Sequence, residues 1–280
     1  MRSMTNRCIF VLLLILAPGC LAQAPATAPA TDPAVDKVLD RIEQVSAGIK
    51  TLKAEVTFDS INDILGDKQR RFGTLIYSAG PPAGFYAHFD KLLVDDKAIA
   101  QDRTYIFDGK WLVEENIEKT SGAGAGTDRV LKQFKKTQIV APNAPPEESN
   151  PLASGRGPFP LPINMNKAVI LARYQVTLVT AADKADPKDQ GQALESIHLK
   201  LVPRPGRRVD FTEADLWYMK DSLLPRKVRT VKIGEDGPEK ETIVDLRQPQ
   251  VNDPVDRNAL DCSEPREPGW EVEVQPWTEK

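Results

Sequence analysis

The chain has 280 residues, and its 37 basic and 40 acidic side chains give a net charge of −3 at pH 7. So small a net charge provides no overall attraction for nucleic acid or anionic lipid, which argues against a nucleic-acid-binding function. Cys8, Cys20 and Cys262 are the only cysteines, too few for the disulfide framework of a small secreted domain.

Residues 1–22 are interpreted as a signal peptide. Arg2 and Arg7 accompany an unbroken apolar run at residues 9–16, which is too short to span a bilayer. Two cleavage positions remain open. Small residues at Cys20 and Ala22 favour cleavage before Gln23 and a soluble product, whereas residues 17–20 form an imperfect lipoprotein box that would leave a lipidated Cys20. We therefore expect export, with Cys20 as the candidate membrane anchor.

Residues 23–32 are rich in Ala, Pro and Thr and are predicted to be a flexible leader. Residues 33–280 have the size of one mainly β domain. Asp32 followed by Pro33 is typical of a helix start, and apolar residues at helical spacing from Val35 to Val45 predict an amphipathic helix that ends at Gly48.

After this helix the pattern changes to the alternation of strands rich in aromatic and β-branched residues. The predicted strands are residues 52–61, 71–78, 84–90, 103–107 and 111–116. Asp108 and Gly109, between the last two, are typical of a two-residue hairpin loop. These strands should therefore form an antiparallel meander.

The middle of the chain is predicted to be irregular. Residues 121–126 form a Gly and Ala loop, and residues 143–162 form a Pro-rich insertion. Residues 128–138 fit either a short helix or a basic strand, and residues 164–172 fit a second helix. Strands resume at residues 174–180, 196–202, 211–219, 227–233 and 241–246.

About ten strands with two or three helices predict a mainly β (α+β) fold with a single curved antiparallel sheet. The apolar faces of the helices have to be buried, so we expect them to cover the concave side of the sheet. A sheet that curls without closing leaves a trough, which would suit an apolar ligand.

The sequence offers no catalytic or metal-binding pattern. His88 and His198 lie in predicted strands without the spacing of metal ligands. Glu114 and Glu115, like the adjacent residues 95 and 96, should point to opposite faces of a strand or into solvent. We therefore expect no enzyme, no cofactor and no metal. Basic clusters at residues 68–71, 132–136 and 204–208 are interpreted as solvated loops and edges, with docking to anionic headgroups or to an acidic partner as the alternative.

Several segments, taken in order, resemble one bacterial family. They are the first helix with Leu39, Ile42 and Val45, the run Phe72, Gly73, Thr74, Leu75, Ile76, Tyr77, the pair Pro81 and Pro82 before Phe85, the run from Tyr105 to Trp111, and residues 197–204, 215–226 and 268–272. In this order they resemble the LolA-like superfamily, which includes the periplasmic lipoprotein carrier LolA, the outer-membrane receptor LolB and the sensor RseB.

The resemblance implies an unclosed barrel of about eleven strands, helices that act as a lid, and a cavity that holds the acyl chains of a lipoprotein in the periplasm. Its partners would be acyl chains or lipid, with an inner- or outer-membrane protein as a further partner of a monomer. The residues expected to line this hydrophobic cavity are Tyr77, Phe85, Tyr105, Phe107, Trp111 and Trp217. An Arg that governs lipid release in the carriers is missing, since its place falls on Ala79.

Three other functions remain open. A sensor or interaction module would dock a protein partner through a sheet edge or the Pro-rich insertion. A LolB-like receptor would fit the sequence if Cys20 is lipidated. A hydrolase would require His88 or His198 to act with a partner that the sequence does not show.

Overall fold

The computed structural model describes residues 32–62, 67–80, 83–94, 97–121, 128–144, 161–163, 165–184, 194–206, 209–234 and 237–278. The predicted signal peptide, nearly all of the leader and most of the Pro-rich insertion lie outside these residues. Helix α1 (Pro33–Ala47) begins as predicted, because the Asp32 side chain accepts a hydrogen bond from the Ala34 amide at 2.8 Å. Val35, Leu39 and Ile42 form its buried face.

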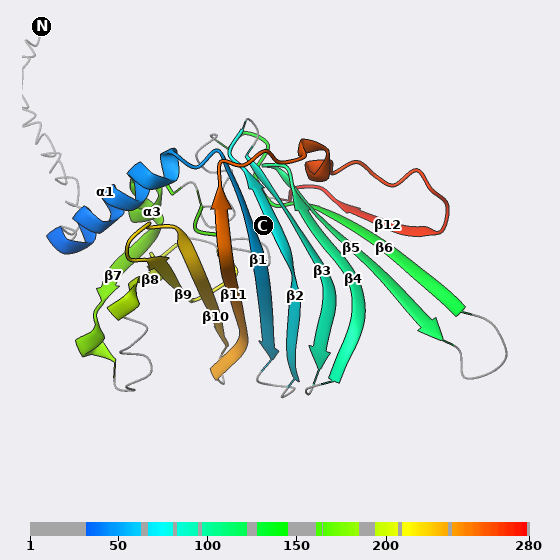
Figure 1. Ribbon diagram of the computed structural model, residues 1–280, viewed down its shortest axis with the longest axis horizontal. Coiled ribbons are helices and arrows are strands. Elements are labelled where there is room, and N and C mark those ends of the chain that lie inside the picture. Colours follow the sequence, from blue (N-terminus) through cyan, green and yellow to red (C-terminus); the bar gives the residue numbers. More distant parts are fainter. Residues whose placement is uncertain are drawn as a thin grey trace, which may run out of the picture. The chain divides into compact units, whose positions relative to one another are not determined.

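One sheet of 12 strands dominates the fold, in the order β12-β6-β5-β4-β3-β2-β1-β11-β10-β9-β8-β7 (Figure 1). The strands are β1 (Thr51–Asn62), β2 (Asp67–Ser78), β3 (Gly84–Val94), β4 (Lys97–Phe107), β5 (Trp111–Ser121), β6 (Asp128–Gln138), β7 (Tyr174–Val179), β8 (Ser196–Pro203), β9 (Glu213–Met219), β10 (Pro225–Gly234), β11 (Gly237–Val251) and β12 (Trp270–Gln275).

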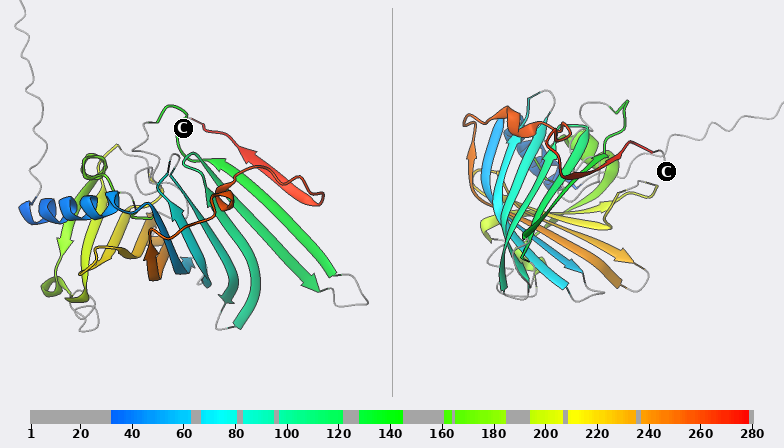
Figure 2. Two further views of the ribbon diagram at one scale, coloured as in Figure 1. Left: turned by 45° about the horizontal axis from the view of Figure 1, so that its top comes forward. Right: turned by 90° about the vertical axis from the view of Figure 1, so that its right-hand side faces the viewer.

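The end strands β12 and β7 do not pair with each other, so the sheet is unclosed. This confirms the predicted fold class. All pairings are antiparallel except that of β12, which runs parallel to β6. Figure 2 shows the strands twisting progressively across the sheet.

Several elements differ in detail from the prediction. Residues 128–138, which fitted a helix or a strand, form β6. The loop after β4 has three residues rather than two, and the Asp108 side chain holds it by accepting from the amides of Lys110 and Trp111. The second helix, α3 (Lys167–Arg173), is shorter than expected because the Asn166 side chain caps it by accepting from the Val169 amide.

Strand β12 is the largest departure, since the alternation of the sequence did not lead us to expect a strand there. After β11 the chain passes a short 3₁₀ turn, η3 (Arg257–Leu260), which lies next to β3 and β4, and then reaches the far edge of the sheet (Figures 1 and 2). There β12, which carries two glutamates, pairs with the basic cluster on β6. Lys135 Nζ lies 3.6 Å from Glu273 Oε2, and Lys132 Nζ lies over the Trp270 ring. The basic cluster at residues 132–136 thus docks a segment of its own chain.

Alternation gives the sheet an apolar inner face, which we define as the face that contacts α1, α3, residues 161–163 and Met165. The main core cluster contains side chains of both helices, of this segment and of alternate strand positions such as Leu75, Leu199 and Leu246. On the opposite, outer face, a small cluster joins Cys262 to Ile106, Val113 and Phe134. None of the helices among the described residues is long and apolar enough to cross a membrane.

Gly73 should be required where β2 bends. The register between β2 and β3 shifts at this residue, and the His88 carbonyl lies where a Cβ would have to go. We expect Gly73→Ala to lower the free energy of unfolding by about 1–3 kcal/mol, because the two strands would be forced apart. Urea denaturation would measure the change. The control Thr74→Ala, at an exposed neighbour, should change stability by only about 0.5 kcal/mol; equal losses would contradict the steric explanation.

Candidate functional site

Four of the six residues predicted to line a cavity lie together on the inner face. Tyr77, Phe85, Tyr105 and Phe107 are between 1% and 6% exposed and belong to the main core cluster. They occupy facing positions of adjacent strands, since Tyr77 pairs with Phe85 and Phe85 with Phe107. The centroids of the Phe85 and Phe107 rings lie 5.6 Å apart. Together these four side chains form the aromatic wall.

Trp111 and Trp217 lie on the outer face instead. Trp111 packs against the small cluster that contains Cys262. Trp217 stacks on His198 with ring centroids 4.3 Å apart, while its neighbour Leu216 faces the core. Alternation along each strand fixed which residues share a face, but the sequence did not say which face would be covered.

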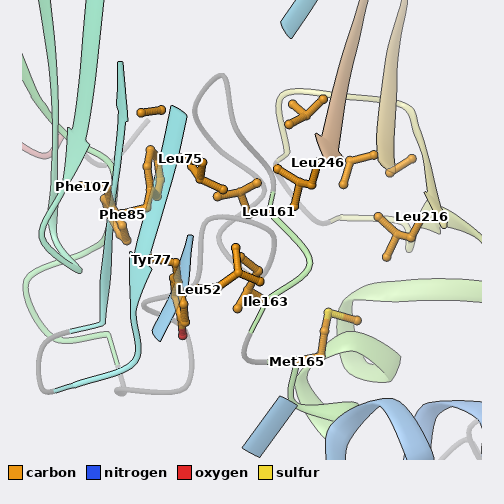
Figure 3. Packing of buried hydrophobic residues seen from close by; sticks show 14 of the residues in the cluster. Leu52, Leu75, Tyr77, Phe85, Phe107, Leu161, Ile163, Met165, Leu216 and Leu246 are labelled. Atoms are coloured by element: carbon orange, nitrogen blue, oxygen red, sulfur yellow. The ribbon is translucent and has the colours of Figure 1, made fainter. Parts of the chain in front are cut away.

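The part of the inner face next to the aromatic wall is covered by residues 161–163 and Met165, which we call the plug. Leu161, Ile163 and Met165 are only 2%, 1% and 5% exposed, and Figure 3 shows Leu161 and Ile163 between the aromatic wall and the strands that carry Leu216 and Leu246. The described residues of the plug have neither helix nor strand structure. Helices α1 and α3 lie at the β7 end of the sheet (Figure 1), so the predicted helical cover is only part of the real one.

Tyr77 carries an unusual polar atom in this apolar setting. Its hydroxyl is buried and has no hydrogen-bond partner. Burial raises the pKa of Tyr77 strongly, so the hydroxyl stays protonated and can donate one hydrogen bond. A buried hydroxyl without a partner costs stability, which marks this position for a ligand atom or water.

The inner face changes from apolar to polar along the strands. On β4, Phe107 and Tyr105 are followed at the next inward position by Arg103, and on β5 Leu112 is followed by Glu114 and Asn116. The Arg103 guanidinium lies 5.6 Å from the Tyr105 ring centroid and also pairs with Glu114. Burial, reinforced by Glu114, raises the pKa of Tyr105 to about 12.

A cavity of about 170 Å³ lies in this polar region. Its lining comes from β4, β5, β6 and β12, and consists of Arg103, Glu114, Asn116, Gln133, Phe134, Lys135, Glu271 and Glu273. We call it the polar pocket. The inner face therefore joins an aromatic wall under the plug to a polar pocket at the β12 end. The sequence-based prediction missed this pocket because its residues come from four strands, one of them unpredicted.

On the outer face, His198 belongs to a charged network with Asp215 and Arg229. His198 Nε2 lies 2.7 Å from Asp215 Oδ1, and Arg229 Nη1 donates to Asp215 Oδ2 at 3.2 Å. Burial alone would raise the pKa of Asp215, but the hydrogen bonds and charges of His198 and Arg229 lower it. His88 lies further along the same face, with Nδ1 3.1 Å from the Thr104 hydroxyl. Both histidines are therefore strand-face residues.

The remaining sequence candidates are placed as follows. Ala79, at the position of the missing family Arg, packs against the main core, and the Arg257 guanidinium lies beside the adjacent Gly80. Burial strongly raises the pKa of the Cys262 thiol, which makes it a poor nucleophile. Glu114 faces the polar pocket and Glu115 faces away from it, as expected of neighbours in a strand. Within the described residues, no three His, Cys, Asp or Glu side chains are grouped to hold a metal ion.

An unclosed sheet whose inner face is covered by helices and a further segment is the architecture that the sequence resemblance implied. The observed architecture agrees with the LolA-like fold that the resemblance predicted. Neither a family model nor a curated protein matches the sequence.

Several solved structures are similar to this chain. A DUF1329 family protein from Desulfovibrio piger shares 14% identity at a TM-score of 0.37, with 82% of this chain and 98% of that chain covered. A putative outer membrane lipoprotein-sorting protein domain from Vibrio parahaemolyticus shares 12% identity at a TM-score of 0.35, with 80% of this chain and 95% of that chain covered. A LolA superfamily protein from Nitrosomonas europaea shares 10% identity at a TM-score of 0.31, with 79% of this chain and 95% of that chain covered. Likenesses this distant carry no information on the ligand of this chain.

Removing the unpartnered hydroxyl should not harm the protein. We expect Tyr77→Phe to leave the free energy of unfolding unchanged or to raise it by about 1 kcal/mol, because a buried hydroxyl without a partner is lost. The matched control is Tyr218→Phe, since the Tyr218 hydroxyl donates to the Pro162 carbonyl at 3.4 Å and its loss should lower stability. Thermal and urea denaturation of both variants would measure this. A destabilised Tyr77→Phe variant would contradict the assignment.

The network on the outer face should make stability depend on pH. A lowered pKa in the folded state means that Asp215 contributes stability above its unfolded pKa of about 3.9, and loses it as the pH falls through the folded pKa. We expect Asp215→Asn to lower the free energy of unfolding at pH 7 and the difference from the parent protein to narrow below about pH 4. The control is the exposed Asp253, whose change to Asn should have little effect at either pH. A difference that stays constant with pH would contradict the prediction.

Proposed function

We propose that this protein is an exported, non-enzymatic binder of acyl chains, from lipid or from a lipoprotein, and that the chains lie against the aromatic wall on the inner face. The observation that carries the proposal is that the wall is covered by the irregular plug rather than by another layer of regular structure. A segment without strand or helix structure can move away without breaking a sheet or helix ladder.

The free energy that the plug gains by burial can be compared with the gain from burying an acyl chain in its place. Burial of a Leu, Ile or Met side chain is worth about 1.5–3 kcal/mol, so the three side chains of the plug contribute about 5–9 kcal/mol. An acyl chain gains about 0.8 kcal/mol for each methylene that it buries. About six to eleven buried methylenes would offset the burial free energy of the three plug side chains. Chains of about twelve carbons or more should therefore displace the plug.

The location within the envelope is part of the same proposal. A free N-terminus at Gln23 would suit a carrier that shuttles its ligand through the periplasm, whereas a lipid on Cys20 would suit a LolB-like receptor. The intact mass of the mature protein decides between them. Native mass spectrometry of protein purified from its own periplasm would show whether lipid or lipoprotein accompanies it.

A second candidate, an interaction module that docks a protein partner, is favoured by β12. Val272 and Val274 are each 43% exposed on this edge strand, and β12 pairs with β6 alone. An open edge of this kind can accept a further strand. A partner captured by the parent protein but not by Val274→Lys would support this function, whereas capture by both would exclude the edge as the docking site.

Weakening the packing of the plug should lower the stability of the protein and raise its affinity for an acyl ligand. We expect Ile163→Ala to lower the free energy of unfolding by about 2–4 kcal/mol and yet to tighten binding of a fluorescent twelve-carbon acyl probe by about tenfold or more, because the plug competes less well with the probe.

The matched control is Phe85→Ala in the aromatic wall, which removes a buried side chain of similar consequence for stability but belongs to the binding surface. It should lower both stability and probe affinity. Weaker binding by both variants, or no binding of any acyl probe by the parent protein, would contradict the proposed function.

A further inference from the structure

The polar pocket contains two buried polar atoms that lack partners. Asn116 is 8% exposed and its Oδ1 has no hydrogen-bond partner, and neither does the buried Nε of Arg103. Other atoms of both side chains are already engaged: Asn116 Nδ2 donates to Glu118 at 2.8 Å, and Arg103 Nη2 donates to Glu114. Since a carboxylate only accepts, the Glu118 contact fixes the Asn116 amide with its oxygen turned away from Glu118.

The two free atoms come from directly opposed positions. Arg103 pairs with Asn116 across β4 and β5, which places their Cβ atoms roughly 4.5–5.5 Å apart. Both side chains line the pocket, so its lining includes one N–H donor and one C=O acceptor from neighbouring residues. A carboxamide has the complementary pair, a C=O that accepts and an N–H that donates.

The charges around the pocket favour an uncharged group over an anion. The lining has three carboxylates, those of Glu114, Glu271 and Glu273, against the two cations Arg103 and Lys135. Arg103 is paired with Glu114, and Lys135 lies 3.6 Å from Glu273. A free carboxylate or phosphate would therefore meet a net negative lining with its cations already neutralised.

The pocket also borders the aromatic wall. Arg103 lies over the ring of Tyr105, the wall residue one inward position away on β4. A volume of about 170 Å³ accommodates a small head group, roughly the space of six water molecules, and is too small for an acyl chain. An amphiphile could thus place its head in the polar pocket and its chain against the wall.

We infer that the polar pocket binds the amide group of an N-acylated amine, with Arg103 Nε donating to the amide oxygen and Asn116 Oδ1 accepting from the amide nitrogen. This inference rests on the proposed function and deepens it by naming the head group of the ligand. Glu271 and Glu273 of β12 complete the lining, so docking of the C-terminal strand assembles the pocket.

The test compares dodecanamide with dodecanoate, two ligands with the same chain and different heads, by displacement of a fluorescent acyl probe from the full-length protein. The parent protein should bind the amide about tenfold more tightly, because only the amide offers a partner to both buried atoms: a carboxylate can accept from Arg103 Nε but cannot donate to Asn116 Oδ1. Asn116→Leu should bring the two affinities together mainly by weakening the amide. The control Gln175→Leu, a comparable change on exposed β7, should keep the preference.

A second measurement addresses the pocket without any acyl chain. Titration with N-methylacetamide should shift the side-chain amide NMR signal of Asn116, and sodium acetate at equal ionic strength should not. Equal affinities for the two dodecyl ligands, or a preference that survives Asn116→Leu, would overturn the head-group inference and leave the proposed function standing. If acyl probes fail to bind while N-methylacetamide shifts the Asn116 signal, the proposed function alone is overturned. If dodecanamide shows no preference and N-methylacetamide leaves the Asn116 signal unchanged, the inference is overturned.

Discussion

The apolar face of an unclosed sheet has to be covered, and most features of this protein follow from that constraint. Twelve strands in one sheet present an extended row of inward apolar side chains, and the edges β12 and β7 do not meet to enclose them. Exposure of such a surface to water would cost about 25 cal/mol per Å². The chain supplies its own cover from α1 and from the plug with the adjacent α3, two segments that lie more than 100 residues apart in the sequence.

This cover is uneven, and the unevenness gives the inner face its functional character. Regular helices lie over the β7 end, the irregular plug lies over the aromatic wall, and the β12 end becomes polar instead of being covered. A surface that is apolar in one part and polar in the next matches an amphiphilic ligand. Tyr77, Arg103 and Asn116 each keep a buried polar atom without a partner along this surface.

The C-terminal segment ties the far edge of the sheet to this arrangement. Trp270 packs edge-on against Phe134 on the outer face, while Glu271 and Glu273 face the polar pocket. Cys262 anchors the connection to the outer cluster, with its sulfur 3.8 Å from the Ile106 and Trp111 carbonyl oxygens. A single late segment therefore protects the edge of β6 and lines the proposed head-group site.

The sequence determined most of the elements, although not β12, and it determined which residues share a face within each strand. Local rules were sufficient for the start of α1 at Asp32, for the hairpin around Asp108 and for the common face of Tyr105 and Phe107, because each depends on residues close in sequence. Only the tertiary structure decided that Trp111 and Trp217 face outward, that β12 pairs in parallel with β6, and that the plug covers the inner face. Alternation distinguishes two faces without saying which is covered, since the covering segments come from distant parts of the chain.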